Sequence, residues 1–259
     1  SMNNKIILKN WINVKDRVKL FDLGNFKQTI SKDMAISIAV YEIIKTFKKY
    51  SIDKGYFYNK FYVYKENYWN EISEEVIEVF LRDCCKNIYK NHIKFHTSSF
   101  YKSVKETYRD DLRVIIDNNE NNVLLNLNNV TLEFSKEGFY PRDHNKNDYL
   151  IYKLKYDYDE NETCSMWDKF LDEMLPNEKH QLLLHQYIGY TFTNHLKLEK
   201  ALFLYGGGGN GKSVVQEVIT KLLGKENTAS VSLGKLTKDP NTIMLIEGKL
   251  LNYCSENEK

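Results

Sequence analysis

The chain has 259 residues, with 37 Lys and Arg against 35 Asp and Glu, and it is 28% charged and 42% hydrophobic. These proportions are typical of a globular protein and exclude a wholly disordered chain, while 12 glycines and 3 prolines exclude a collagen-like or proline-rich architecture. No apolar run approaches the roughly 18 residues of a membrane-spanning helix, and no hydrophobic signal core follows the polar first residues. We therefore expect no membrane contact and a cytoplasmic location.

Charge is distributed unevenly along the chain. Residues 1–110 contain 20 Lys and Arg and 13 Asp and Glu, whereas residues 111–259 contain 17 and 22. A basic first half is suited to phosphates, because neutralising a polyanion releases its counterions. The alternative is a solvated, lysine-rich surface with no ligand.

The first half predicts helices and a hairpin. Apolar residues recur at helical spacing from Met34 to Tyr50, and Ser73 followed by two glutamates is typical of a helix start. The aromatic residues of 61–64 and 67–69 favour a short β-hairpin. The expected elements are helices at 34–50, 73–89 and 97–110 around that hairpin.

Beyond residue 111 the pattern predicts strands and turns, then helices. We expect strands at 112–116, 123–127 and 130–134, an extended segment within 149–158, and helices at 167–175 and 178–193. The run 201–205 is short, apolar and followed by glycine, as a buried parallel strand is. The fold class is therefore α/β, with a helix-rich domain at 1–165, which carries a small β segment, and a P-loop parallel-sheet domain at 166–259.

Residues 206–213 match the phosphate-binding pattern GxxxxGK[ST] in full. The match lies between the predicted strand and a predicted helix at 214–223 that ends at Gly224. Glycines let several backbone N–H groups converge on phosphates, and the N-terminus of the following helix favours the same anion. The expected nucleotide-binding residues are Gly206, Gly207, Gly208, Gly209, Asn210, Gly211, Lys212, Ser213 and Val214.

A P-loop enzyme also needs an acid for Mg²⁺ and for the attacking water. The run 249–256 is largely apolar and ends in Glu256, so we expect Ser213 and Glu256 to hold the metal and Lys212 and Glu256 to be catalytic. Many P-loop ATPases have an Asp-Glu pair at this position, whereas this chain has Ser255-Glu256. The alternative is that Glu256 is an exposed acid without a role.

Several of these segments resemble superfamily 3 helicases, most closely the phage, plasmid and poxvirus-type primase-helicases. The resemblance lies in residues 186–190, 198–213, 223–224 and 248–252 with Glu256, and Asn210 before Gly-Lys-Ser is typical of this branch. The upstream segments 61–64, 68–69 and 167–171 are similar to the helical domain of the same family, so the resemblance covers most of residues 56–259.

The resemblance implies a DNA-translocating AAA+ ATPase that uses ATP and Mg²⁺ and works on single-stranded or forked DNA in replication. It also implies a homo-hexamer and a primase, fused or separate, as partners. The family's third motif, its DNA-contacting hairpin and its arginine finger have no counterpart in this sequence. We therefore expect the chain to correspond to the first part of a helicase, to hydrolyse ATP poorly and not to unwind DNA.

Two other functions remain open on the sequence. A P-loop kinase or similar enzyme of small molecules would share the phosphate loop but would need an acceptor pocket and a lid. Alternatively, residues 1–165 would be a docking module for DNA or a primase. The ATPase beside it would then act as a switch and not as a helicase motor. Lysines interleaved with tyrosines near residues 48–62 would suit stacking of unpaired bases, or the tyrosines would simply fill a core.

Overall fold

The computed structural model describes residues 30–116, 123–135, 137–192 and 199–254. The chain divides into two compact units, one formed by residues 1–117 with 146–151 and the other by 118–145 with 152–259. Among the helices described, none combines the length and the apolar character that crossing a bilayer requires.

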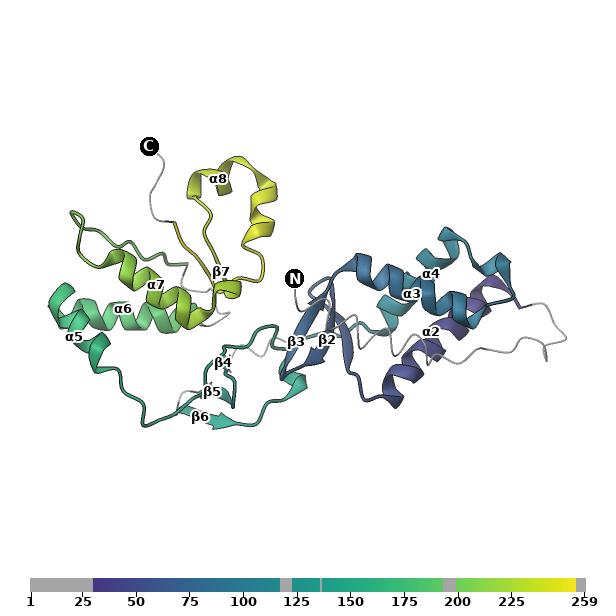
Figure 1. The fold of residues 1–259 in the computed structure, drawn as a ribbon, viewed down its shortest axis with the longest axis horizontal. Coiled ribbons are helices and arrows are strands. Elements are labelled where there is room, and N and C mark those ends of the chain that lie inside the picture. Colours follow the sequence, from purple (N-terminus) through teal and green to yellow (C-terminus); the bar gives the residue numbers. More distant parts are fainter. Residues whose placement is uncertain (1–29, 117–122, 136, 193–198, 255–259) are drawn as a thin grey trace. The chain divides into compact units, whose positions relative to one another are not determined.

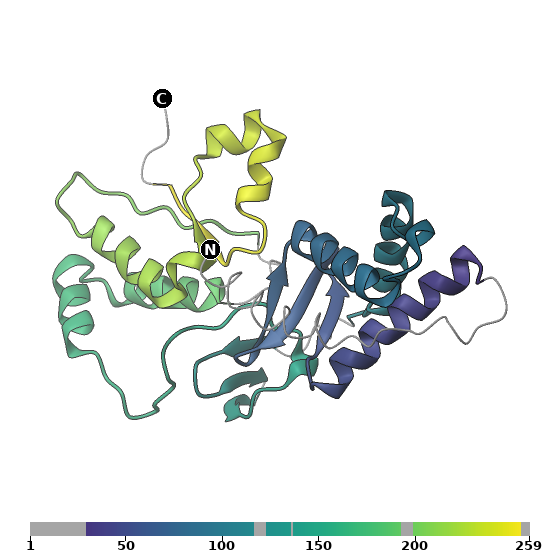
Figure 2. The ribbon, with the colours of Figure 1, turned by 45° about the vertical axis from the view of Figure 1, so that its right-hand side comes forward.

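The first unit consists of helices around a three-stranded antiparallel sheet. In both views the three helices α2, α3 and α4 lie on one side of this sheet (Figures 1 and 2). Its elements are α2 (Lys32–Lys49), β1 (Lys54–Phe57), β2 (Lys60–Lys65), β3 (Tyr68–Ile72), α3 (Glu74–Ile88), η2 (Ile93–Phe95), α4 (Ser98–Asp111) and η3 (Lys146–Asp148).

Tight turns set the register of this sheet. The strands pair in the order β1-β2-β3, with Tyr56 opposite Phe61. Tyr58 and Asn59 join the first two strands with φ of 48° and 59°, and residues 66–67 repeat the arrangement with 57° and 69°. Two successive positive φ values are the mark of a type I′ turn, whose twist matches that of antiparallel strands. The predicted hairpin is confirmed, and β1 extends it to three strands.

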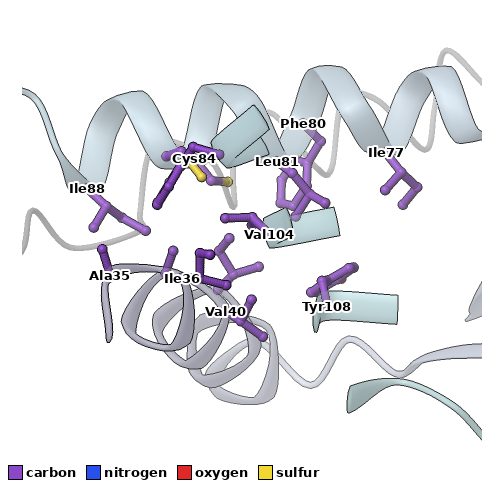
Figure 3. Close-up of a cluster of buried hydrophobic side chains, with 14 of the residues drawn as sticks. Ala35, Ile36, Val40, Ile77, Phe80, Leu81, Cys84, Ile88, Val104 and Tyr108 are labelled. Atoms are coloured by element: carbon purple, nitrogen blue, oxygen red, sulfur yellow. The ribbon is translucent and has the colours of Figure 1, made fainter. Parts of the chain in front are cut away.

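The three helices enclose a core with one face of the sheet. Figure 3 shows Val104 of α4 between Ile36 of α2 and Leu81 of α3. Ser73 and Thr97 cap α3 and α4 by accepting hydrogen bonds from backbone N–H groups in their first turns. All three helices predicted in this half are confirmed within a few residues. The amphipathic spacing and the capping residues indicate the same helix bounds.

The opposite face of the sheet is covered by a segment from much later in the chain. Phe57, Tyr62 and Trp69 are buried there. The Trp69 indole N–H donates to the Lys146 carbonyl at 2.7 Å, and the Tyr149 ring stacks on Trp69 with centroids 5.8 Å apart. Residues 146–151 therefore belong to this unit although 28 residues of the other unit precede them.

The strand predicted at 112–116 is wrong. The backbone N–H of Tyr56 donates to Leu112, and that of Val114 donates to Tyr56, so this segment forms one parallel bridge beside β1. α4 continues to Asp111, with Leu112 as its C-cap. The helix end leaves too few residues before 117 for a full strand.

The second unit contains a small antiparallel sheet and the helices around the phosphate loop. The sheet has the order β4-β5-β6, and a separate parallel pair joins β7 and β8. Its elements are β4 (Val123–Asn126), β5 (Thr131–Ser135), β6 (Gly138–Arg142), α5 (Ser165–Met174), α6 (Glu178–Thr191), α7 (Lys212–Leu223), η5 (Lys225–Asn227), β7 (Thr228–Ala229), α8 (Leu233–Lys238), η6 (Pro240–Leu245) and β8 (Leu251–Asn252).

The run 201–205 was predicted to be a buried parallel strand, and this is wrong. It carries no strand, and Phe203 and Tyr205 are 74% and 101% exposed. A strand in the middle of a parallel sheet needs a hydrogen-bonded neighbour on each side. Within the described residues of the second unit, the parallel pairing consists of β7 and β8, two residues each, and neither pairs with 201–205.

The architecture is therefore mixed α and β, with small sheets and helices in each unit. In the largely apolar run before Glu256, Leu251–Asn252 form the strand β8, while residues 255 and 256 lie outside the described residues. The two compact units are divided after residue 117, whereas the sequence predicts a domain boundary at residue 165. The predicted boundary separates two domains of the resembled family and stays a prediction.

A lysine lies inside the aromatic part of the first unit. The Lys54 Nζ lies 3.4 Å from the centroid of the Phe47 ring and donates to the Tyr108 hydroxyl at 3.3 Å. Burial lowers the pKa of Lys54 well below its usual 10.5, and the nearby Lys48 charge acts in the same direction, against the smaller opposing effects of Cys84 and Asp53. Holding this ammonium charged at neutral pH therefore costs stability.

We expect Lys54→Met to raise the free energy of unfolding by about 1 kcal/mol at pH 7, because removing a desolvated charge outweighs the lost cation–π contact. The unfolded state binds the extra proton between the lowered pKa and 10.5, so wild-type stability rises with pH through that window relative to the variant. Chemical unfolding between pH 7 and 10 measures both effects. Lys94→Met is the control, since Lys94 is exposed and lies over the Phe95 ring. A variant less stable than wild type at pH 7 would contradict this interpretation.

Candidate nucleotide-binding site

The phosphate loop is supported by three packed helices. Val215 and Ile219 of α7 are buried against Leu171 of α5 and Leu184 and Ile188 of α6. The predicted helices at 167–175, 178–193 and 214–223 are thus confirmed, and Gly224 ends α7 with φ of 85°. This packing fixes the end of α7 that carries the loop.

The loop makes a left-handed turn into α7. Gly208, Gly209 and Gly211 have φ of 97°, 64° and 71°, which side-chain-bearing residues rarely adopt. A Cβ at Gly211 would lie 2.9 Å from the Phe170 ring and 3.0 Å from the Met174 methyl group. Any other residue at this position would therefore force Phe170 or Met174 of α5 to shift.

Lys212 reaches back across the loop. Its Nζ donates to the Gly206 carbonyl and to the Asn210 side-chain oxygen, both at 2.9 Å. The N-cap of α7 is Gly211, which has no side chain to accept from the first-turn N–H groups. The structure thus brings together the glycines, Asn210 and Lys212, with a cation and backbone donors beside one another, and their binding of a nucleotide stays a prediction.

The residues expected to hold the metal are only partly described. Ser213 and Val214 lie exposed in the first turn of α7. Glu256 lies outside the described residues, so its role stays a prediction. Within the described part of the chain, no three His, Cys, Asp or Glu side chains are grouped as they would be to bind a metal.

A cavity of about 340 Å³ opens beside the loop, and sequence reasoning did not predict it. Its walls include Phe170 and Met174 of α5, Leu183 of α6 and the loop residues Asn210 and Lys212. The amphipathic pattern of 167–175 predicted the helix, and apolar residues of that helix, Phe170 and Leu171 among them, both pack in the core and line this cavity. The sequence feature that could have pointed to this cavity is the short distance along the chain between that helix and the glycine motif.

Comparison with known proteins gives two findings. The family described as D5 N terminal like matches residues 41–176, just over half of the chain. The chain is also similar to a putative helicase, 121R, of Invertebrate iridescent virus 3, with 29% identity over 136 residues. The aligned part is 51% of this chain and 14% of the viral protein, so this chain corresponds to a small part of that relative.

Proposed function

Because this chain belongs to the D5 N terminal like family, we propose that it is the nucleotide-binding part of an ATP-dependent DNA helicase of the primase-helicase type. The observation that carries the proposal is the loop at 206–213, where a full GxxxxGK[ST] match enters a helix and its lysine folds over the glycine turn. The similarity to a viral putative helicase supports the same class of function.

The residues present fit a polyphosphate group. The glycine turn and the first turn of α7 offer backbone N–H donors, and the Lys212 ammonium already donates to two oxygen atoms at 2.9 Å. In this proposal Lys212 would exchange the Gly206 carbonyl for phosphate oxygens, and Ser213 with Glu256 would hold Mg²⁺. The bound metal would offset negative charge on the phosphates while the terminal phosphoryl group is transferred to water.

The finer features remain part of the proposal. These are a superfamily 3 AAA+ parallel-sheet domain, a homo-hexamer, a primase partner, a cytoplasmic location and hydrolysis coupled to movement along DNA. They follow from the resemblance of residues 186–190, 198–213, 223–224 and 248–252 with Glu256 to that family. Two measurements address the two halves of the proposed activity: binding of ATP with Mg²⁺, and binding of single-stranded DNA.

The exposed face of α2 is the surface we propose for DNA. Lys45 lies over the Tyr41 ring at 5.4 Å from its centroid, and the Tyr41 side chain is 62% exposed. Lys48 and Lys49 end the same helix and are exposed, and neither forms an ion pair with another described residue. An exposed aromatic ring beside lysines suits a single strand, whose bases stack while its phosphates meet the cations.

We expect Lys48→Gln/Lys49→Gln to weaken single-stranded DNA binding and to reduce the slope of log affinity against log salt by about 0.7 for each lysine that meets a phosphate. Fluorescence anisotropy of a labelled oligonucleotide at several salt concentrations measures both quantities. The control is Lys169→Gln/Lys221→Gln, which removes the same charge from exposed positions of the second unit. Equal losses in the two double variants would show that only net charge matters and would contradict a DNA surface on α2.

A further inference from the structure

A cluster of exposed lysines lies where α3 ends and α4 begins. Residues 84–105 contain five lysines and no Asp or Glu. One of the five, Lys105, pairs with glutamates of α3. The other four and a lysine at the start of α2 are exposed, and none of them forms an ion pair with another residue that the structure describes. We call these five exposed lysines the basic end of the first unit: Lys32, Lys86, Lys90, Lys94 and Lys102.

Three buried aromatic rings hold this end of the unit together. The ring centroid of Tyr89 lies 4.9 Å from that of Phe95 and 5.8 Å from that of Phe100, and the last two are 5.2 Å apart. The Tyr89 hydroxyl donates to the Ala35 carbonyl of α2, and Figure 3 shows Ala35 beside Ile88 at the end of α3. The start of α2, the end of α3, η2 and the start of α4 therefore meet at one end of the unit.

Contacts of the lysines themselves place them on this common surface. Lys94 directly precedes Phe95, and its Nζ lies 4.8 Å from the centroid of that ring. The Lys32 Nζ donates to the Ser99 hydroxyl at 3.1 Å, which places the starts of α2 and α4 next to each other. Backbone N–H groups at a helix start favour anions, so both helix starts act in the same direction as the lysines.

The basic end differs from the exposed face of α2 in the direction of its aromatic rings. Tyr89, Phe95 and Phe100 are 0%, 3% and 1% exposed, and the Tyr101 hydroxyl is buried as well. On α2, by contrast, the Tyr41 side chain is 62% exposed. A surface that offers cations while its rings point inward can bind phosphates but cannot stack unpaired bases.

We propose that the basic end binds double-stranded DNA through its phosphates, while the exposed face of α2 binds the single strand. The inference rests on the proposed helicase function and assigns the duplex part of a forked substrate to a surface of its own. The five lysines outnumber the acids of the same segments, Asp33 and Asp83. A duplex carries one negative charge per about 1.7 Å of its axis, so several lysines meet phosphates at once and no base contact is needed. Binding at the basic end is therefore strongly salt-dependent and indifferent to base sequence.

The test measures fluorescence anisotropy with three labelled probes, namely a short blunt-ended DNA duplex, a single strand of thymidine nucleotides and polyglutamate. The basic-end variant of the full chain is Lys86→Gln/Lys90→Gln/Lys94→Gln. The matched control removes the same charge from exposed lysines of the second unit: Lys169→Gln/Lys179→Gln/Lys238→Gln. Because all six lysines are exposed, both variants should fold, and thermal unfolding checks this.

We expect the basic-end variant to bind the duplex about 10-fold or more weakly than wild type at about 0.1 M salt. Its slope of log affinity against log salt should fall by about 0.9 for each lysine that contacts a phosphate. Its affinity for the single strand should stay within about 2-fold of wild type, as should the affinity of the control for both DNAs, because charges beyond roughly 10 Å are largely screened at this salt.

Two further comparisons sharpen the expectation. Lys48→Gln/Lys49→Gln should show the opposite selectivity, with weaker binding of the single strand and unchanged binding of the duplex. Polyglutamate should bind wild type more weakly than the duplex does, because an extended chain spaces its charges about 3.3 Å apart.

Four results would be adverse, and they separate the two proposals. If wild type binds both DNAs and the basic-end variant binds the duplex equally well, the inference is wrong although the proposed function stands. Equal losses for duplex and single strand would also overturn it, because the surface would then not select the duplex. Polyglutamate that binds as tightly as the duplex and depends on the same lysines would assign the basic end to an acidic polypeptide instead. If wild type binds neither DNA, the proposed helicase function itself fails.

Discussion

Replacing Lys212 with alanine is expected to remove the stabilisation that ATP and Mg²⁺ give to the wild-type chain. A ligand that binds only the native state at about 100 times its dissociation constant adds about 2.7 kcal/mol to the free energy of unfolding. In the variant the phosphates lose their side-chain cation, and the contacts from Lys212 to Gly206 and Asn210 are lost as well. Thermal unfolding with and without Mg²⁺-ATP measures the difference.

The control for this experiment lies on the same helix. Lys221 is exposed at the C-terminal end of α7 and pairs with Glu217 at 2.8 Å. Lys221→Ala should keep the full ATP-dependent shift, because exposed ion pairs contribute little and Lys221 is far along the helix from the loop. A Lys212→Ala variant that ATP stabilises as strongly as it stabilises wild type would contradict the role given to Lys212.

The second large effect is expected at Gly211. Alanine there would have to adopt φ of 71° and place its Cβ 2.9 Å from the Phe170 ring. A left-handed backbone costs an L-residue about 1–2 kcal/mol, and overpacking adds about 1–3 kcal/mol, so we expect a loss of about 3 kcal/mol in the free energy of unfolding. ATP binding should be lost together with the turn geometry.

Gly207 provides the matched control for Gly211. A Cβ at Gly207 would meet no atom within 4 Å, and its φ lies outside the left-handed region. Gly207→Ala should therefore unfold within about 0.5 kcal/mol of wild type, as surface substitutions do. Urea unfolding of the two variants makes the comparison, and equal stabilities would show that the turn and its packing on α5 are not as described.

Local signals predicted most of the helices, because their evidence is contained in the segments themselves. Ser73 caps its helix as the sequence predicts, and Thr97, where the next helix is expected to begin, accepts the same kind of hydrogen bond. The strand β1 was missed because Lys54–Phe57 is short and contains Gly55. β6 was missed because its sequence, Gly138–Arg142, includes Pro141 and is mostly exposed.

The errors at 112–116 and 201–205 have a different origin. Both runs are apolar, but a strand depends on partners that a local pattern does not contain. Leu112 and Val114 contribute single backbone bonds to β1, and Phe203 remains exposed. The same reason explains why the cavity was missed: Phe170 and Leu183 come together only when α5 and α6 pack beside the loop.

The most direct test of the account is a crystal structure of the chain with a non-hydrolysable ATP analogue and Mg²⁺. We predict phosphate oxygens within hydrogen-bonding distance of the backbone N–H groups of residues 208–213, the Lys212 ammonium turned from the Gly206 carbonyl to the phosphates, and the metal at the Ser213 hydroxyl. An analogue bound elsewhere, with Lys212 still on Gly206 and no density at the glycine turn, would contradict the nucleotide-binding function.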